Sequence, residues 1–254
     1  TISGYQWNLS GPPIAGATSS TYTVTTAGSY TVTVTNSNNC STTSAVRNVT
    51  VTALPTITSG ANPSVCRSVT TANLPYSAPT GTPNQYSIDY DATANGAGFT
   101  DVTNAALPAS PIVLTVPAAA PVATYNATLT VRNSTNGCVS NSYPITITVN
   151  ARPVPTITGA ASACVGSTGN IYTTEAGMSG YTWTVSAGGT ITAGAGSNSI
   201  TVSWTSTGTK TITVNYTNAN GCNATTATIY NVTVNANPIA TITGATSFCA
   251  GGSL

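Results

Sequence analysis

The sequence predicts an all-β protein made of β-sandwich domains in tandem, and three observations support this. Apolar residues form 40% of the chain, and Val, Ile and Thr alternate with partners of opposite polarity in short runs, as in half-buried strands. Strong helix formers are scarce, with one Met, one Glu and one Lys among 254 residues. A strand–turn–strand–proline passage closed by cysteines occurs three times, at 33–66, 130–164 and 213–249.

The recurring passage has a nearly constant length. In each copy an alternating strand leads to an Asn/Gly turn ending in Cys, then to a second strand, a proline hinge, a TIT-type signature and another Cys. The interval between the two cysteines is 26, 26 and 27 residues, whereas the intervals between successive passages are 72 and 58 residues. A constant joint with variable interiors predicts an elongated string of separate modules.

The first module, residues 1–53, is expected to be the C-terminal part of a domain. Its run Gly4-Tyr5-Gln6-Trp7 matches Gly180-Tyr181-Thr182-Trp183, which lies well inside a later module. Residues 28–34 alternate as a half-buried strand, and Val49 and Val51 are placed on the strand that returns after the turn.

Module 2 (54–152) and module 3 (153–237) are each expected to be complete. Short alternating runs predict strands near residues 86–90, 112–116, 125–132 and 145–149 in module 2, and near 171–174, 181–185, 200–204, 211–216 and 229–234 in module 3. About seven strands in 85–100 residues is typical of an immunoglobulin-like sandwich. Residues 238–254 repeat the opening of module 3 and are expected to begin a further module, so that the chain is a segment of a longer filament.

The modules resemble a known group of repeats. GYQWNLSGPPIAGATSSTYTVTTAGSYTVTVTNSNNC (4–40) and the corresponding stretch 180–222 are similar to the Ig-like and PKD-like repeats of very large bacterial surface proteins, and residues 84–116 resemble a second repeat type of the same proteins. Those proteins are exported by the type IX secretion system, and the gliding-motility adhesins are the best-known group. The WDFGDG signature of classical PKD domains is absent, as is the C-terminal sorting domain of such exported proteins.

Six cysteines indicate an oxidising, extracellular compartment and allow two sets of disulfides. In the first set each module closes on itself, through Cys66–Cys138 and Cys164–Cys222, with Cys40 and Cys249 pairing outside the sequence. In the second each joint is closed, through Cys40–Cys66, Cys138–Cys164 and Cys222–Cys249. The turn cysteine lies at the N-terminal end of its module and the next strand runs the module's length, at about 3.3 Å per residue, so the cysteines of one joint lie too far apart. This argument favours pairing within modules.

Catalytic chemistry has little support, and we expect no enzyme. The chain has no His, so Ser-His-Asp and Cys-His arrangements are impossible. No cofactor is expected. Asp89 and Asp91 on one strand face, with Asp101 across a hairpin, are a candidate for a Ca²⁺ site, although solvated polar side chains on the strand are the preferred explanation.

Trp7 and Trp183 occupy matching strand positions, which suits core tryptophans packed against an inter-strand bridge. The alternative hypothesis is that these two tryptophans form an aromatic platform that binds sugars. Trp204 has no counterpart in module 1 and is ambiguous.

The predicted function is that of a non-catalytic structural or adhesive stalk or filament on a bacterial cell surface. With charged residues at 4% and net charge +1, the chain lacks the basic clusters that nucleic acid or anionic membranes require. The longest apolar run, 111–123, contains three prolines and is too short to cross a bilayer. The expected partners are neighbouring modules, joined by semi-rigid proline hinges, and further copies that associate end to end or laterally. The alternative is a carbohydrate- or ligand-binding accessory module of a secreted enzyme or adhesin.

Overall fold

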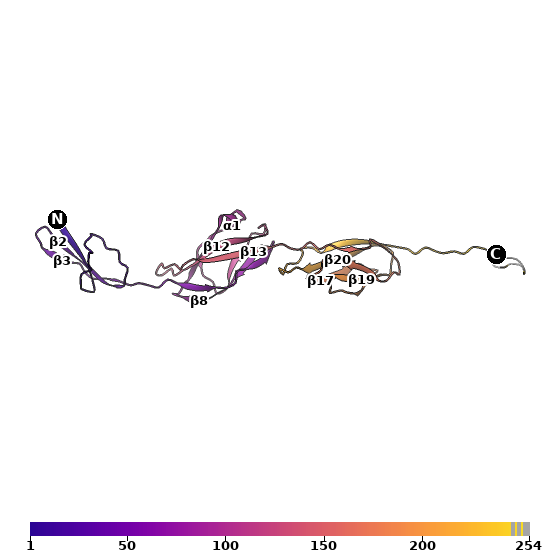
Figure 1. The fold of residues 1–254 in the computed structure, drawn as a ribbon, viewed down its shortest axis with the longest axis horizontal. Helices are drawn as coiled ribbons and strands as arrows, with labels where there is room; N and C mark the ends of the chain where they lie inside the picture. Colours follow the sequence, from indigo (N-terminus) through magenta and orange to yellow (C-terminus); the bar gives the residue numbers. More distant parts are fainter. Residues whose placement is uncertain (245–246, 248–249, 251–254) are drawn as a thin grey trace.

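The computed structural model describes residues 1–244, 247 and 250, and it places modules 1, 2 and 3 one after another along the long axis of the molecule (Figure 1). Almost all regular structure in these residues is β, as the sequence predicts. The helix α1 (Ala92–Gly96) is the exception, and it begins where Asp91 caps it by accepting a hydrogen bond from the Ala94 amide.

Module 1 forms one antiparallel sheet. Its strands are β1 (Ile2–Leu9), β2 (Gly28–Asn36), β3 (Ser41–Thr43) and β4 (Arg47–Val49), and β2 pairs with the other three. The returning strand ends at Val49, and Val51 lies exposed beyond it, which corrects the predicted extent.

Module 2 is built from one large sheet and two smaller ones. The large sheet has the order β10 (Val102–Ala106), β9 (Gln85–Tyr90), β12 (Ala123–Arg132), β13 (Tyr143–Asn150) and β6 (Ser64–Cys66). The smaller sheets pair β11 (Ile112–Thr115) with β7 (Thr71–Leu74) and β5 (Thr56–Ser59) with β8 (Tyr76–Thr80). Four of the strands coincide with those predicted by alternation.

Module 3 is a sandwich of two four-stranded sheets. One has the order β14 (Thr158–Gly159), β16 (Asn170–Thr173), β19 (Ser199–Trp204) and β18 (Gly189–Ala193). The other has the order β15 (Ser162–Cys164), β21 (Thr228–Asn235), β20 (Gly208–Thr217) and β17 (Ser179–Val185). Alternate residues of β19 and β20 point inward and are buried, which is the pattern that burial on one face dictates.

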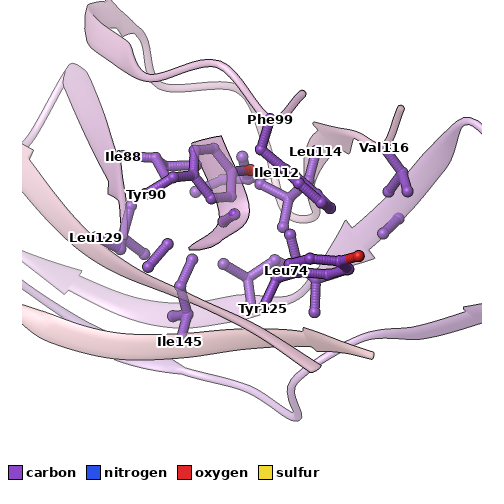
Figure 2. Packing of buried hydrophobic residues seen from close by; sticks show 14 of the residues in the cluster. Leu74, Ile88, Tyr90, Phe99, Ile112, Leu114, Val116, Tyr125, Leu129 and Ile145 are labelled. Atoms are coloured by element: carbon purple, nitrogen blue, oxygen red, sulfur yellow. The ribbon is translucent and has the colours of Figure 1, made fainter. Parts of the chain in front are cut away.

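Modules 2 and 3 have separate hydrophobic cores. In module 2 the inward side chains of the large sheet pack against those of β7 and β11, and Figure 2 shows Leu74, Ile112 and Leu114 facing Ile88 and Leu129. Phe99, whose ring centroid lies 4.7 Å from that of Tyr125, fills the space beside them. The core of module 3 draws on β16, β17, β19, β20 and β21.

The two ends of a module carry different cysteines. We call the ends the N-terminal pole and the C-terminal pole. In module 2 the turn after β12, which holds Cys138, lies at the N-terminal pole. The strand β6 runs parallel to the last strand, β13, and pairs Cys66 with Asn150, so Cys66 lies at the C-terminal pole. Module 3 repeats this: β15 runs parallel to β21 and pairs Cys164 with Asn235.

Candidate functional site at the joint between modules

The joint between modules 2 and 3 brings together the C-terminal pole of one module and the N-terminal pole of the next. Cys66 comes from the first and Cys222 from the second. The Asn218 side-chain oxygen accepts hydrogen bonds from the amides of Asn220 and Cys222, at 3.1 and 3.0 Å, and this closes the turn that presents Cys222. Asn36 closes the turn at Cys40 with the same two bonds, from Asn38 and Cys40.

A disulfide joins Cys66 to Cys222 across this joint, with Cα atoms 5.6 Å apart and 156 residues between them in sequence. The predicted pairings Cys66–Cys138 and Cys164–Cys222 are therefore wrong in this structure. The reason is geometric: the two cysteines of one module lie at opposite poles, a full strand length apart, beyond the reach of a disulfide. The alternative set of pairs fails as well, because Cys222 is already bonded to Cys66.

Arg152 fastens the peptide linker to both modules. Its Nε donates to the Arg67 carbonyl at 2.8 Å, and its Nη1 donates to the backbone and side-chain oxygens of Asn223 at 3.0 and 3.2 Å. The side-chain Nδ2 of Asn218 donates to the Ala151 carbonyl at 3.1 Å. Since the planar guanidinium holds its donors in a fixed fork, these bonds set the direction of the linker as well as its position.

Glu175 anchors the start of module 3. Its carboxylate accepts from the backbone amide of Thr156 and from the hydroxyls of Thr156, Thr174 and Tyr216, at distances between 2.6 and 3.1 Å. Burial opposes ionisation of Glu175, but the hydrogen bonds from Thr156 and Thr174 outweigh it and lower its pKa to about 2. Burial, and then the neighbouring Glu175 carboxylate, raise the pKa of Tyr216 to about 12.

Replacing Glu175 with Gln is expected to destabilise module 3 at neutral pH by at most about 1 kcal/mol, because the site is open to solvent screening. The folded-state pKa lies below the ordinary value of 4.5, so the stabilisation is complete above pH 4.5 and is lost as pH falls toward 2. Thermal unfolding of both chains from pH 7 to pH 2 measures this. The control is Asp89→Asn, at an exposed carboxylate on β9. A Glu175→Gln difference that stays constant down to pH 2 contradicts the assignment.

Three further cysteines among the described residues are unbonded. Cys40 and Cys164 are exposed and Cys138 is half-buried. Cys249 lies outside the described residues, so its predicted pairing is not addressed by the structure.

The structure does not gather the three aspartates of the candidate Ca²⁺ site. Asp91 is a helix cap rather than a strand residue, and its second oxygen accepts from Asn126 at 3.0 Å. Asp101 accepts from the amide of Tyr90 at 2.9 Å. No cluster of three or more His, Cys, Asp or Glu side chains suited to a metal ion occurs in the described part of the chain. These carboxylates organise the loop around α1.

Trp7 and Trp183 do occupy equivalent positions, opposite Val32 on β2 and Val214 on β20. Trp183 is buried, and its indole N–H donates to the Ser197 carbonyl at 2.9 Å. Trp7 is only half-buried, because module 1 has no second sheet in this chain. The disulfide lies at the joint rather than in the core, so neither tryptophan packs against an inter-strand bridge as predicted. Trp204 is completely buried and presents no sugar-binding platform.

The hollows on the modules are open to solvent. The one beside α1 measures about 260 Å³ and includes Tyr86, Phe99 and Asp101 in its lining. A second, of about 430 Å³, is lined by Asp89, Asp91 and Asn126 among others, and its volume lies at the low end of the roughly 300–1,000 Å³ of typical ligand pockets. Among the described residues α1, with five residues, is too short to span a bilayer, and no other helix is a candidate.

One family model matches part of the chain. Residues 150–232, which include nearly all of module 3, match the family model of the PKD-like domain. No curated protein matches the chain. Similar solved structures include the D00-D0 domain of intimin, at 16% identity and TM-score 0.36, covering 71% of this chain and 99% of that one. They also include the fibronectin(III)-like modules of Clostridium thermocellum CbhA, at 15% identity and TM-score 0.34, covering 71% of this chain and 95% of that one. The chain is an all-β array of tandem domains of immunoglobulin-like fold, and its module 3 is similar to a PKD-like domain.

Proposed function

We propose that this chain is a non-catalytic segment of an extracellular stalk or filament. Its modules hold the distal end of the protein away from a bacterial cell surface and transmit force between that end and the cell. The observation that carries the proposal is the covalent closure of the joint between modules 2 and 3 by Cys66–Cys222. The disulfide lies across a module boundary and outside both sandwich cores. Besides stabilising the pair against unfolding, it fixes the orientation of one module relative to the other.

The other contacts of the joint serve the same purpose. Arg152 ties the linker to a carbonyl of module 2 and to Asn223 of module 3, while Glu175 holds Thr156 at the start of module 3. The linker prolines Pro153 and Pro155 restrict the backbone further. A hinge intended for free movement would not need a disulfide, an arginine fork and two prolines within one joint.

The remaining surface suits a passive role. With net charge +1 and few charged residues, association of the rod with its surroundings is insensitive to salt. The disulfide fits an oxidising location outside the cell. The resemblance to repeats of type IX-secreted adhesins supports a surface location and that route of export.

Small-angle X-ray scattering on the oxidised chain tests the proposal. We expect an elongated particle whose distance distribution between modules 2 and 3 is narrow, and which broadens on addition of a reductant without a loss of β-structure by circular dichroism. A Cys66→Ser variant should resemble the reduced chain, whereas Cys164→Ser, at the equivalent position of module 3, should behave as the parent chain.

Two results oppose the stalk function. A compact particle in the scattering experiment, in which the modules fold back on one another, would contradict an elongated stalk. Binding to a glycan array by the oxidised chain would favour the alternative, a carbohydrate-binding accessory module. Labelling intact cells with an antibody, in the presence and absence of a functional type IX system, tests the location and the export route.

A further inference from the structure

The 26–27-residue interval between cysteines has a structural meaning in the copy that joins modules 2 and 3, from Cys138 to Cys164. From Cys138, at the N-terminal pole of module 2, the chain follows β13 to the C-terminal pole. It then crosses the linker and runs along β14 and β15 to Cys164, at the C-terminal pole of module 3. The segment therefore extends over two module lengths, from one end of the pair to the other.

We propose that Cys66–Cys222 is one unit of a repeating cross-link, in which the first cysteine of each module pairs with the turn cysteine of the module that follows. The pairing rule stands on the geometry of the joint alone. Only its mechanical consequence rests on the stalk function proposed above.

Equivalent surroundings support the rule. Cys164 is placed in module 3 as Cys66 is in module 2, on a short strand that runs parallel to the last strand of its module, and its exposure leaves it open to a following module. Cys40 and Cys138 lie in turns of modules 1 and 2 that are equivalent to the turn of module 3 that holds Cys222. In each turn the amide of an asparagine, Asn36, Asn133 or Asn218, donates to the carbonyl of the turn cysteine at 2.8–3.0 Å. The poles that meet at a joint thus present one cysteine of each kind.

The rule assigns every unbonded cysteine of the described residues to a neighbouring module. Cys164 pairs with the turn cysteine of the module that begins at residue 238, and Cys138 pairs with the first cysteine of the domain to which module 1 belongs. Cys40, the turn cysteine of module 1, pairs with the first cysteine of the module before it. Each bridge forms when two thiols lose two protons and two electrons to a disulfide oxidant, which is itself reduced to a dithiol. Residues 238–254 repeat the opening of module 3 and so supply the first cysteine, Cys249, for the next bridge.

This cross-link changes which residues carry tension. A pull enters module 2 through its first strands, passes from Cys66 through sulfur to Cys222, and leaves along β21, so the residues between the two cysteines are bypassed. The bypassed interiors are free to vary in length, as the 72- and 58-residue intervals do. The cysteine-to-cysteine segments have to reach across two modules, which accounts for their constant length.

Extending the chain tests the pairing rule. A second copy of residues 170–237 appended after Leu254 completes a module that begins with the chain's own residues 238–254. Peptide mapping without reduction, after alkylation of free thiols, should find Cys164 linked to the turn cysteine of the appended copy, in addition to Cys66–Cys222. Replacing the appended turn cysteine with Ser should leave Cys164 alkylated. Cys164 found alkylated in the first chain, or linked to Cys138, overturns the rule.

A second extended chain tests the same pairing without a module assembled from residues 238–254 and an appended copy. Residues 153–237 are repeated directly after Asn237, so that two identical copies of module 3 follow one another and both cysteines have their native surroundings. The same link, from the first copy's Cys164 to the second copy's Cys222, is expected. If both chains fold and neither forms the link, the bridge between modules 2 and 3 is an isolated feature and the rule fails, whatever the scattering shows about shape.

Single-molecule extension of the 254-residue chain from its two ends tests whether tension passes through the Cys66–Cys222 bridge instead of through the residues between the two cysteines. Reduction should lengthen the fully extended chain by the 156 residues between Cys66 and Cys222, roughly 500 Å at about 3.3–3.6 Å per residue. Cys66→Ser should show the longer extension without reductant. Equal extensions of the oxidised and reduced chain overturn the assignment of Cys66–Cys222 as the element that carries tension.

Discussion

Replacing Cys66 with Ala is expected to lower the free energy of unfolding of the two bridged modules by roughly 5 kcal/mol, the value that the chain-entropy model gives for a loop of this length. The bridge closes 156 residues, which include most of both cores. An unfolded chain held by such a bridge has far fewer conformations, so removing the bridge favours unfolding. Calorimetry of the oxidised parent, the reduced parent and the variant measures the effect.

Cys164→Ala is the matched control, since Cys164 holds the position in module 3 that Cys66 holds in module 2 but is unbonded in this chain. It should leave the unfolding temperature within about a degree of the parent, as exposed substitutions generally do. Addition of reductant should lower the unfolding temperature of the parent and of Cys164→Ala, and leave Cys66→Ala unchanged. Identical unfolding of Cys66→Ala and the oxidised parent would show that the bridge contributes nothing to stability.

The strands could be predicted because the chain alternates strictly wherever one face is buried. In β12 and β20, apolar side chains fill the inner face and polar side chains the outer one. The helix α1 was missed because its five residues, Ala92–Gly96, carry no periodicity, and its one signal is the capping residue Asp91. Alternation identifies strands but does not say which sheet a strand joins.

The disulfide pairing was predicted wrongly because of the place of the first cysteine in each module. The turn cysteines lie at the N-terminal pole, as predicted, but the prediction counted one strand length between a turn cysteine and the next cysteine. Ten residues separate Thr56 from Cys66, enough for a second passage along the module, and applying the same rise per residue to them places Cys66 at the opposite pole. Once both cysteines are placed by this rule, the pairing across the joint is the one that geometry permits.

The polar contacts of the joint could not be read from local patterns. Arg152 and Glu175 are each isolated charged residues, and their partners lie up to 85 residues away in sequence. The available signal was their rarity: in a chain with four acidic and five basic residues, Arg152 in a proline hinge and the single Glu, Glu175, are worth testing as joint contacts.

The Trp204→Ala variant is expected to unfold module 3 while module 2 stays folded. Trp204 is fully buried. Its ring packs edge-on against the ring of Tyr172, with the ring centroids 6.4 Å apart, and it also packs against the backbone of Gly189. Removing a large buried aromatic side chain costs about 3–5 kcal/mol through lost contacts and a cavity, a large part of the stability of a domain of this size. Hydrogen exchange should show loss of protection throughout β19 and β20, with protection retained in β12 and β13.

Trp7→Ala is the control for this prediction, because Trp7 is half-buried in module 1 and takes no part in either core. Trp204→Phe distinguishes the effect of side-chain volume from that of the indole N–H. Within the described residues this N–H has no hydrogen-bond partner. Phenylalanine therefore fills less volume than tryptophan, but it also removes a buried donor that is unpaired. Its cost should be well below that of alanine. Loss of protection in β12 and β13 together with β19 and β20 would mean that the joint couples the two cores into one cooperative unit. In that case the bridge and the arginine fork would transmit unfolding as well as orientation.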